Sequence, residues 1–211
     1  MDDGNKSGLF YPNRFINQTL RAYASILGEN GLSSVLNMAG LSSLIENPLP
    51  DNLDKQFDFT DFASIQVSLD DVFGVRGAKG ISQRAGETTL NLGLDQTGSL
   101  VGVKHAEFQR LPWETRLLVG LSSMASMLTH LTDQVITVSQ SPDSILLSIK
   151  QCPVCWDRRN LEKPACSFFN GQLQALSTWF SGGQEFHITE SKCIGMGDEA
   201  CEFIIPKTPI R

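Results

Sequence analysis

The chain has 211 residues, of which 41% are hydrophobic and 19% are charged, and its formal net charge is −6. This is the composition of a globular domain, and the acidic balance disfavours a general binder of nucleic acid or of anionic membranes, because both partners need a basic surface. No apolar run approaches the roughly 18 residues that span a bilayer, and the acidic, polar start Met1–Asn5 does not resemble a signal peptide. We therefore expect a cytoplasmic protein without a nucleic-acid or membrane partner.

The first half of the chain is predicted to be helical. Residues 1–12 are interpreted as a flexible polar tail, and a helix follows, since apolar residues then recur at spacings of three and four. Gly28 is expected to end this helix, and a short helical piece is expected at 32–44. A second amphipathic helix is predicted from the stripe Phe62, Ile65, Leu69, Val72 and Phe73.

A glycine-rich stretch runs from Gly74 to Gly102. Its beginning, Gly74–Gly80, superficially resembles a phosphate-binding loop, but the spacing matches neither Gly-x-x-x-x-Gly-Lys-Ser/Thr nor Gly-x-Gly-x-x-Gly. No β-run precedes it either. We therefore interpret these glycines as positions where helices end or pack closely together.

The second half of the chain predicts an alternation of sheet and helix. Helices are expected at 117–131 and 169–180, and strands at 135–139, 145–149, 186–190 and 202–205. A hairpin turn is expected between the first two strands because Ser, Pro and Asp fill the connection. The order of helices, hairpin, helix and hairpin favours an α+β fold, with the N-terminal helices packed on an antiparallel sheet.

All five cysteines lie between Cys152 and Cys201, which in a cytoplasmic protein favours thiols or metal ligands over a disulfide framework. Cys152 and Cys155 form a Cys-x2-Cys pair at the exit of a strand, a spacing suited to two bonds to one tetrahedral metal ion. A redox pair of the thioredoxin type would instead open a helix, whereas loop-forming residues follow here.

The final hairpin is predicted to bring Glu190, Cys193 and Cys201 together, because Glu190 ends one strand and Cys201 opens the next. Cys166 precedes the helix between the two hairpins. Zn²⁺ accepts thiolate sulfur and carboxylate oxygen, so these four residues are candidate ligands. The spacing leaves two alternatives open: buried cysteines acting as small hydrophobic residues, or an iron–sulfur cluster that also uses the Cys-x2-Cys pair.

The pattern of these residues resembles the 4-vinyl reductase domain family over roughly residues 110–206. The matching segments are Cys166-x4-Gly171, Glu190-x2-Cys193 and Gly197-Asp198-x2-Cys201-x-Phe203. The resemblance implies a fold similar to the TRAPP subunits and to heme-based nitric-oxide sensors, and a homodimer formed through the N-terminal helices. In phenol-responsive members of the family three Cys and one Glu hold zinc, and the matching positions here are Cys166, Glu190, Cys193 and Cys201.

The same resemblance implies one domain at 13–206, with a helical dimerisation part at 13–105 and a zinc-containing α/β part at 106–206. Cys152 and Cys155 lie outside the family's ligand set, so either could replace Glu190 or bind a second centre.

We expect a binding or sensory module for a small hydrophobic or aromatic ligand, with a structural zinc ion. Trp179 and Phe180 are candidate residues of its cavity, whereas the histidines His105, His130 and His187 are interpreted as ordinary surface or core residues. A reductase of a tetrapyrrole vinyl group is the alternative, but the sequence has no dinucleotide or flavin motif and no paired acid and base. Catalysis is therefore not expected, and any signalling would need a separate partner protein.

Overall fold

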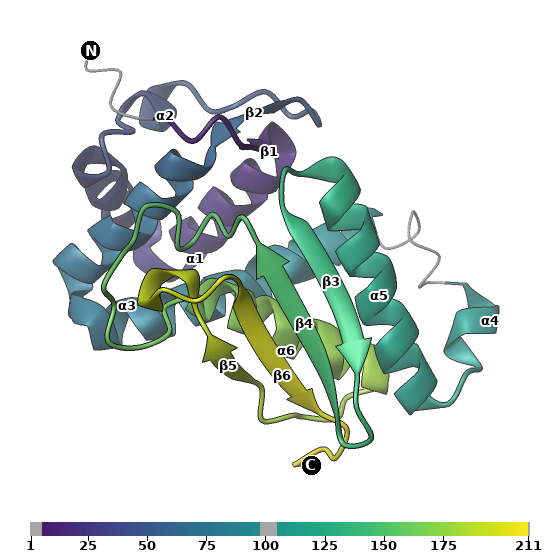
Figure 1. Cartoon of the computed structure of the whole chain (residues 1–211). Helices are drawn as coiled ribbons and strands as arrows, with labels where there is room; N and C mark the ends of the chain where they lie inside the picture. The colour runs from purple at the N-terminus through teal and green to yellow at the C-terminus, as the bar shows by residue number, and fades with distance from the viewer. Residues whose placement is uncertain (1–5, 98–104, 211) are drawn as a thin grey trace.

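The computed structural model describes residues 6–97 and 105–210 and confirms the expected α+β fold (Figure 1). Its helices are α1 (Asn13–Met38), α2 (Ser43–Glu46), α3 (Phe59–Thr97), α4 (Ala106–Gln109), α5 (Trp113–Leu131) and α6 (Ser167–Ser181), with a 3-10 turn, η1, at Ile194–Met196. Its strands are β1 (Phe10–Pro12), β2 (Lys55–Asp58), β3 (Val135–Gln140), β4 (Ser144–Lys150), β5 (Thr189–Lys192) and β6 (Cys201–Pro206). The first two strands pair with each other, and the others form an antiparallel sheet in the order β3-β4-β6-β5.

The two central strands of this sheet bury one face. The pairs that face each other across β4 and β6 and are buried on both strands are Ile145–Ile205, Leu147–Phe203 and Ile149–Cys201. The period of two that places these residues on one face is the alternation expected for a half-buried antiparallel sheet. Helices α5 and α6 lie against the sheet (Figure 1). The last strand pair starts later than expected, because β5 begins at Thr189 and the segment 185–188 is irregular.

Ordered structure begins earlier in the chain than expected, since residues 1–12 were interpreted as a flexible polar tail. Residues 10–12 form β1, the side chain of Tyr11 is buried, and the backbone N–H of Phe10 donates to Asp133 Oδ2 at 2.8 Å. These contacts attach the N-terminal segment to the loop before β3, so residues 10–12 belong to the folded domain.

Both long helices contain a kink at a glycine. α1 continues past Gly28, where the backbone has φ 71°, and α3 continues past Gly74, where φ is 69°. Residues with a Cβ rarely adopt such a positive φ, which explains why glycine occupies both kinks. Gly28 therefore interrupts the first helix as expected, and the piece expected at 32–44 is divided between the second segment of α1 and the short α2.

Glycines also allow α3 and α6 to pack at very close range. A Cβ atom on Gly86 would lie 2.0 Å from the carbonyl oxygen of Phe168, and one on Gly171 would lie 1.9 Å from that of Gln83. This confirms the interpretation of Gly86 as a close-packing position; Gly98 and Gly102 lie outside the described residues. The contact fixes the N-terminal half of α6 against α3.

One hydrophobic cluster extends from the N-terminal helices to the sheet. The apolar stripe predicted for the second amphipathic helix lies on α3 and is divided: Phe62, Ile65 and Leu69 are buried within the chain, whereas Val72 and Phe73 are 39% and 38% exposed. Within the described residues, no helix combines the length and apolar character needed to cross a membrane.

Candidate metal centre and ligand cavity

The five cysteines converge at one end of the four-stranded sheet. Cys152 and Cys155 follow β4, Cys166 precedes α6, Cys193 follows β5 and Cys201 opens β6. Because β4 and β6 are antiparallel neighbours, the end of one lies beside the start of the other. All five side chains are buried, with no exposed surface. The convergence therefore includes the Cys-x2-Cys pair, whose role the sequence had left open.

The sulfur atoms lie in direct contact. Cys166 Sγ is 3.0 Å from Cys155 Sγ and 3.4 Å from Cys201 Sγ. Cys152 Sγ also lies 3.4 Å from Cys166 Sγ, and Cys155 Sγ lies 3.3 Å from Cys193 Sγ. In a tetrahedral site with Zn–S bonds of about 2.3 Å, two sulfur ligands lie about 3.8 Å apart. The observed spacing is close to that of thiolates sharing one ion.

Glu190 completes the cluster. Its Oε2 accepts a hydrogen bond of 2.9 Å from the backbone N–H of Cys166, at the start of α6. Its Oε1 is buried and has no hydrogen-bond partner among the described residues. Burial and the nearby Cys193 thiolate raise the pKa of Glu190 to about 9. A buried carboxylate oxygen without a donor is unfavourable, and a metal ion would supply its missing partner.

Two overlapping groups of four residues have mutually close ligand atoms. One is Cys152, Cys155, Cys166 and Cys201; the other is Cys166, Glu190, Cys193 and Cys201; in each, the ligand atoms lie within 4.8 Å of one another. The second group is the ligand set implied by the family resemblance, so the structure brings all four of those residues together. Cys152 and Cys155 form the other group with two members of this set, Cys166 and Cys201.

The buried thiols differ in how readily they ionise. Burial raises the pKa of Cys152 and Cys166, whereas hydrogen bonds from Cys152 and then Cys166 lower the pKa of Cys155. Arg158, three residues after Cys155, pairs with Asp70 of α3 at 2.7 Å rather than with a thiolate. Several thiolates in one buried site require a cation, and a bound metal ion would provide it.

The family motif around Gly197 and Asp198 shapes the loop that carries Cys193. The backbone N–H of Cys193 donates to Asp198 Oδ2 at 2.8 Å, and the chain turns at Gly197 with φ 103°. The backbone N–H of Ile194 donates to Cys201 Sγ at 3.4 Å. These bonds orient the two cysteines of the hairpin toward the cluster.

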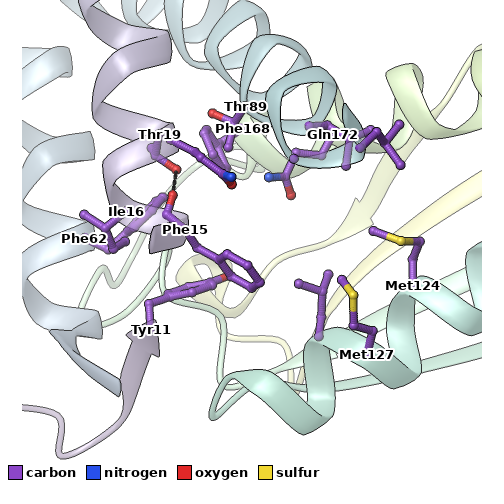
Figure 2. A pocket seen from close by; sticks show the side chains of 15 residues that line it. Tyr11, Phe15, Ile16, Thr19, Phe62, Thr89, Met124, Met127, Phe168 and Gln172 are labelled. Carbon is purple, nitrogen blue, oxygen red and sulfur yellow. Dashed lines mark hydrogen bonds between the residues drawn. The ribbon is translucent and has the colours of Figure 1, made fainter. Parts of the chain in front are cut away.

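A separate cavity of about 60 Å³ lies between the N-terminal helices, α5 and α6. Most of its lining is apolar: Tyr11, Phe15, Ile16, Phe62, Leu90, Leu94, Met124, Met127, Leu128 and Phe168. Figure 2 shows the thioethers of Met124 and Met127 and the amide of Gln172 facing this space. The Thr89 hydroxyl, also in the lining, is buried without a hydrogen-bond partner among the described residues.

Trp179 and Phe180, the residues proposed for a cavity from the sequence, lie elsewhere. Phe180 is fully buried in the core, where its ring would meet a Cβ on Gly120 at 2.6 Å. Trp179 lines a surface hollow beside Phe186. The sequence signal that was overlooked is the methionine content of the 117–131 stripe, since flexible, polarizable Met side chains are common at adaptable binding surfaces.

The cysteine cluster and the cavity meet at the start of α6. Cys166 belongs to the cluster, and Phe168, two residues later, belongs to the cavity wall. Tyr11 lies between the same two regions: it lines the cavity, and burial together with the charge of Cys152 raises its pKa well above the ordinary value. Only a few residues therefore separate the cluster from the cavity wall.

The comparisons with known proteins agree with this arrangement. Residues 145–207 match the family model of the 4-vinyl reductase domain, which confirms the resemblance drawn from the cysteine pattern. An H-NOX protein from S. oneidensis in the Fe(II)NO ligation state has a TM-score of 0.60 and 14% identity, covering 93% of this chain and 99% of that chain. The Fe(II) unliganded H-NOX protein from K. algicida has a TM-score of 0.59 and 13% identity, covering 95% and 98%. These two structural similarities show a nitric-oxide-sensor-like fold. The comparison with curated proteins found no match to the sequence.

The likeness to H-NOX does not extend to a haem ligand. Haem in such sensors or in globins is commonly held by a proximal histidine. The three histidines of this chain, His105, His130 and His187, are all exposed, and none of them lines the cavity. The residues present therefore do not fit a histidine-ligated haem in this space.

Proposed function

We propose that this protein is a small-molecule-binding sensory domain in which a structural zinc centre fixes one wall of the ligand cavity. The observation that carries the proposal is the short connection through the start of α6, where Cys166 belongs to the cluster and Phe168 to the cavity. The zinc ligands are Cys166, Glu190, Cys193 and Cys201. Four protein ligands leave no open position for water, which makes the zinc structural rather than catalytic.

Zinc is favoured over an iron–sulfur cluster by the spacing of the thiols. Sulfur atoms separated by 3.0–3.4 Å leave no space between them for inorganic sulfide. They suit an ion that bonds directly to thiolates, and the orphaned oxygen of Glu190 suits zinc, which also accepts carboxylate. Elemental analysis of protein purified without chelators should find zinc, and the absence of any metal would contradict this part of the proposal.

The lining of the cavity supports a small apolar or aromatic ligand that carries one hydrogen-bonding group. The walls are apolar, and Gln172 offers an amide donor and acceptor. The cavity of about 60 Å³ is smaller than the roughly 150 Å³ that admits benzene in an engineered cavity. Admission of an aromatic ring therefore requires Met124 and Met127 to change rotamer, which unbranched Met side chains do readily.

The reductase alternative has less support. A tetrapyrrole would need a cleft of at least several hundred Å³, so it could use only the open surface hollows of about 480–550 Å³ and not this cavity of about 60 Å³. The sequence also supplies no motif that would bind a hydride donor. Incubation with a tetrapyrrole and reduced nicotinamide cofactor should therefore return the tetrapyrrole unchanged.

We also propose that the protein forms a homodimer through its helical part at 13–105. The α/β part at 106–206 would then hold the zinc ion, and a separate partner protein would receive the signal. Val72, Phe73 and Val75 leave an apolar strip exposed along α3, with Val75 exposed by 72%. Light scattering should give about twice the chain mass of 23.2 kDa. A Val75→Asp variant should then be monomeric.

Phenol and toluene together test the ligand proposal, since the two differ only in a hydroxyl or methyl substituent. Both should raise the melting temperature, because a ligand bound only by the folded state stabilises it. Gln172→Leu should weaken phenol binding about fivefold and leave toluene binding nearly unchanged, since one hydrogen bond is worth about 1 kcal/mol.

Two tryptophan variants on α5 provide the control. Met127→Trp should fill the cavity and abolish both thermal shifts, whereas Val119→Trp alters a 41% exposed position on the same helix and should preserve them. Absence of a shift with either probe, or equal effects of the two tryptophans, would contradict binding in this cavity.

A further inference from the structure

We infer that the cysteine cluster holds two metal ions, bridged by the thiolates of Cys166 and Cys201. The inference extends the proposed zinc centre and assigns Cys152 and Cys155, which the zinc set alone leaves unused. One ion is bound by Cys152, Cys155, Cys166 and Cys201, and the other by Cys166, Glu190, Cys193 and Cys201.

The number of donors matches this arrangement. Two tetrahedral ions need eight ligand positions, and two bridging thiolates reduce the number of residues to six, as in the Zn₂Cys₆ modules. The cluster contains five cysteines and Glu190, and its two groups of four overlap in Cys166 and Cys201. Those two sulfur atoms lie 3.4 Å apart, so they can form the shared edge of two tetrahedra.

A single ion in either position leaves donors without a partner. With one ion in the Cys-x2-Cys group, the buried Oε1 of Glu190 keeps no partner among the described residues. With one ion in the Glu190 group, the buried Cys152 and Cys155 bind no ion although they contact thiolates that do. Cys155 Sγ, for example, lies 3.0 Å from Cys166 Sγ. Two ions satisfy all six side chains, provided that Cys155 Sγ and Cys193 Sγ, which lie 3.3 Å apart and bind different ions, separate when both ions are bound.

The charge balance also favours two ions. Five thiolates and a carboxylate with two divalent cations carry a formal charge of about −2, the same as three thiolates and a carboxylate with one cation. The second ion therefore lets Cys152 and Cys155 ionise without adding net charge to a buried site. A thiolate-rich set of this kind selects a soft or borderline ion, and zinc satisfies both groups.

The metal count of the purified protein is the first test. Native mass spectrometry with elemental analysis should find two zinc ions per chain after zinc addition and removal of excess metal. The double variant Cys152→Ser/Cys155→Ser should keep one, and so should Glu190→Gln/Cys193→Ser, because each removes the unshared ligands of one ion. His130→Ala, at an exposed position on α5, should keep two.

Cobalt titration tests the bridge in the wild-type protein and does not depend on the folding of any variant. The first equivalent of Co²⁺ should give the paramagnetic signal of an isolated tetrahedral ion, and the second should reduce that signal, because bridging thiolates couple the two spins. Saturation at one equivalent, or additive signals from two independent ions, would overturn the inference.

The outcomes separate this inference from the proposed function. One zinc ion per chain in the wild type would overturn the two-ion centre and leave the structural zinc in place. No metal at all would remove both. Binding of phenol is measured independently, so its failure affects only the ligand proposal.

Discussion

The cysteine cluster and the ligand cavity lie close together but are held by different forces. The cluster consists of the five buried cysteines and Glu190, most of which lie in loops. Its side chains are held by contacts with one another. The cavity is formed by helices whose spacing is set by close backbone contact at Gly86 and Gly171. Under the proposed zinc centre, the stability of the first region depends on metal, whereas that of the second depends on packing. Perturbations can be chosen that affect one and spare the other.

The largest effect is expected from removal of a shared ligand. Cys201→Ser should abolish metal binding and lower the free energy of unfolding by about 3–5 kcal/mol, because breaking a buried charged set leaves uncompensated groups behind. Chemical denaturation with parallel metal analysis measures both effects. The helices that line the cavity should retain their circular dichroism at low denaturant. Full metal occupancy in this variant would contradict the assignment of Cys201.

A smaller loss is expected where the helices meet. Gly86→Ala would place a Cβ 2.0 Å from the Phe168 carbonyl oxygen, so α3 and α6 must separate, at a cost of about 3 kcal/mol. Gly80→Ala is the matched control, because its Cβ would meet nothing within 4 Å and alanine favours the helix by up to about 1 kcal/mol. Thermal unfolding of both variants checks the difference. Equal melting temperatures would show that the close contact is unimportant.

The cavity itself should tolerate, and even benefit from, loss of a polar group. Thr89→Val removes a buried hydroxyl that has no hydrogen-bond partner among the described residues. It should stabilise the ligand-free protein by about 1 kcal/mol, since the desolvation cost of that group disappears. Zinc content should not change. Destabilisation measured by urea unfolding would indicate that the hydroxyl has a partner, such as an ordered water.

The smallest effect concerns the start of α3, outside both regions. The Asp58 carboxylate accepts hydrogen bonds from Thr60 N–H at 2.8 Å and from Ser7. Burial opposes ionisation of Asp58, but the hydrogen bonds from Ser7 and Thr60 outweigh it and lower its pKa.

A lowered folded-state pKa contributes stability above the unfolded value of about 3.9 that is lost as pH falls through the folded-state pKa. Asp58→Asn should therefore cost about 0.5 kcal/mol at neutral pH, because Asn still caps the helix, and the difference should disappear in acid. Urea unfolding across pH measures this, and a pH-independent difference would contradict it.

Much of the fold could be predicted from local patterns. The stripe at 117–131 lies within α5, and the alternating residues at 145–149 lie within β4, because each period reflects which side of one element is buried. A break of the helix was predicted at Gly28, and Gly74 was interpreted only as a position where helices end or pack closely, but that each helix continues beyond its glycine was not predicted. A glycine allows a helix either to end or to bend, and only the packing of the residues beyond it decides between them.

The sequence by itself determined the types of element and the set of metal donors, since residue chemistry and short spacings carry that information. It established the group of Cys166, Glu190, Cys193 and Cys201 as candidate ligands through the family pattern. Only the tertiary structure decided that the Cys-x2-Cys pair joins that group and that the cavity is lined from β1, α1, α3, α5 and α6. The physical reason is that these contacts join residues far apart in the chain. Their meeting depends on strand register and helix packing, which no local period encodes.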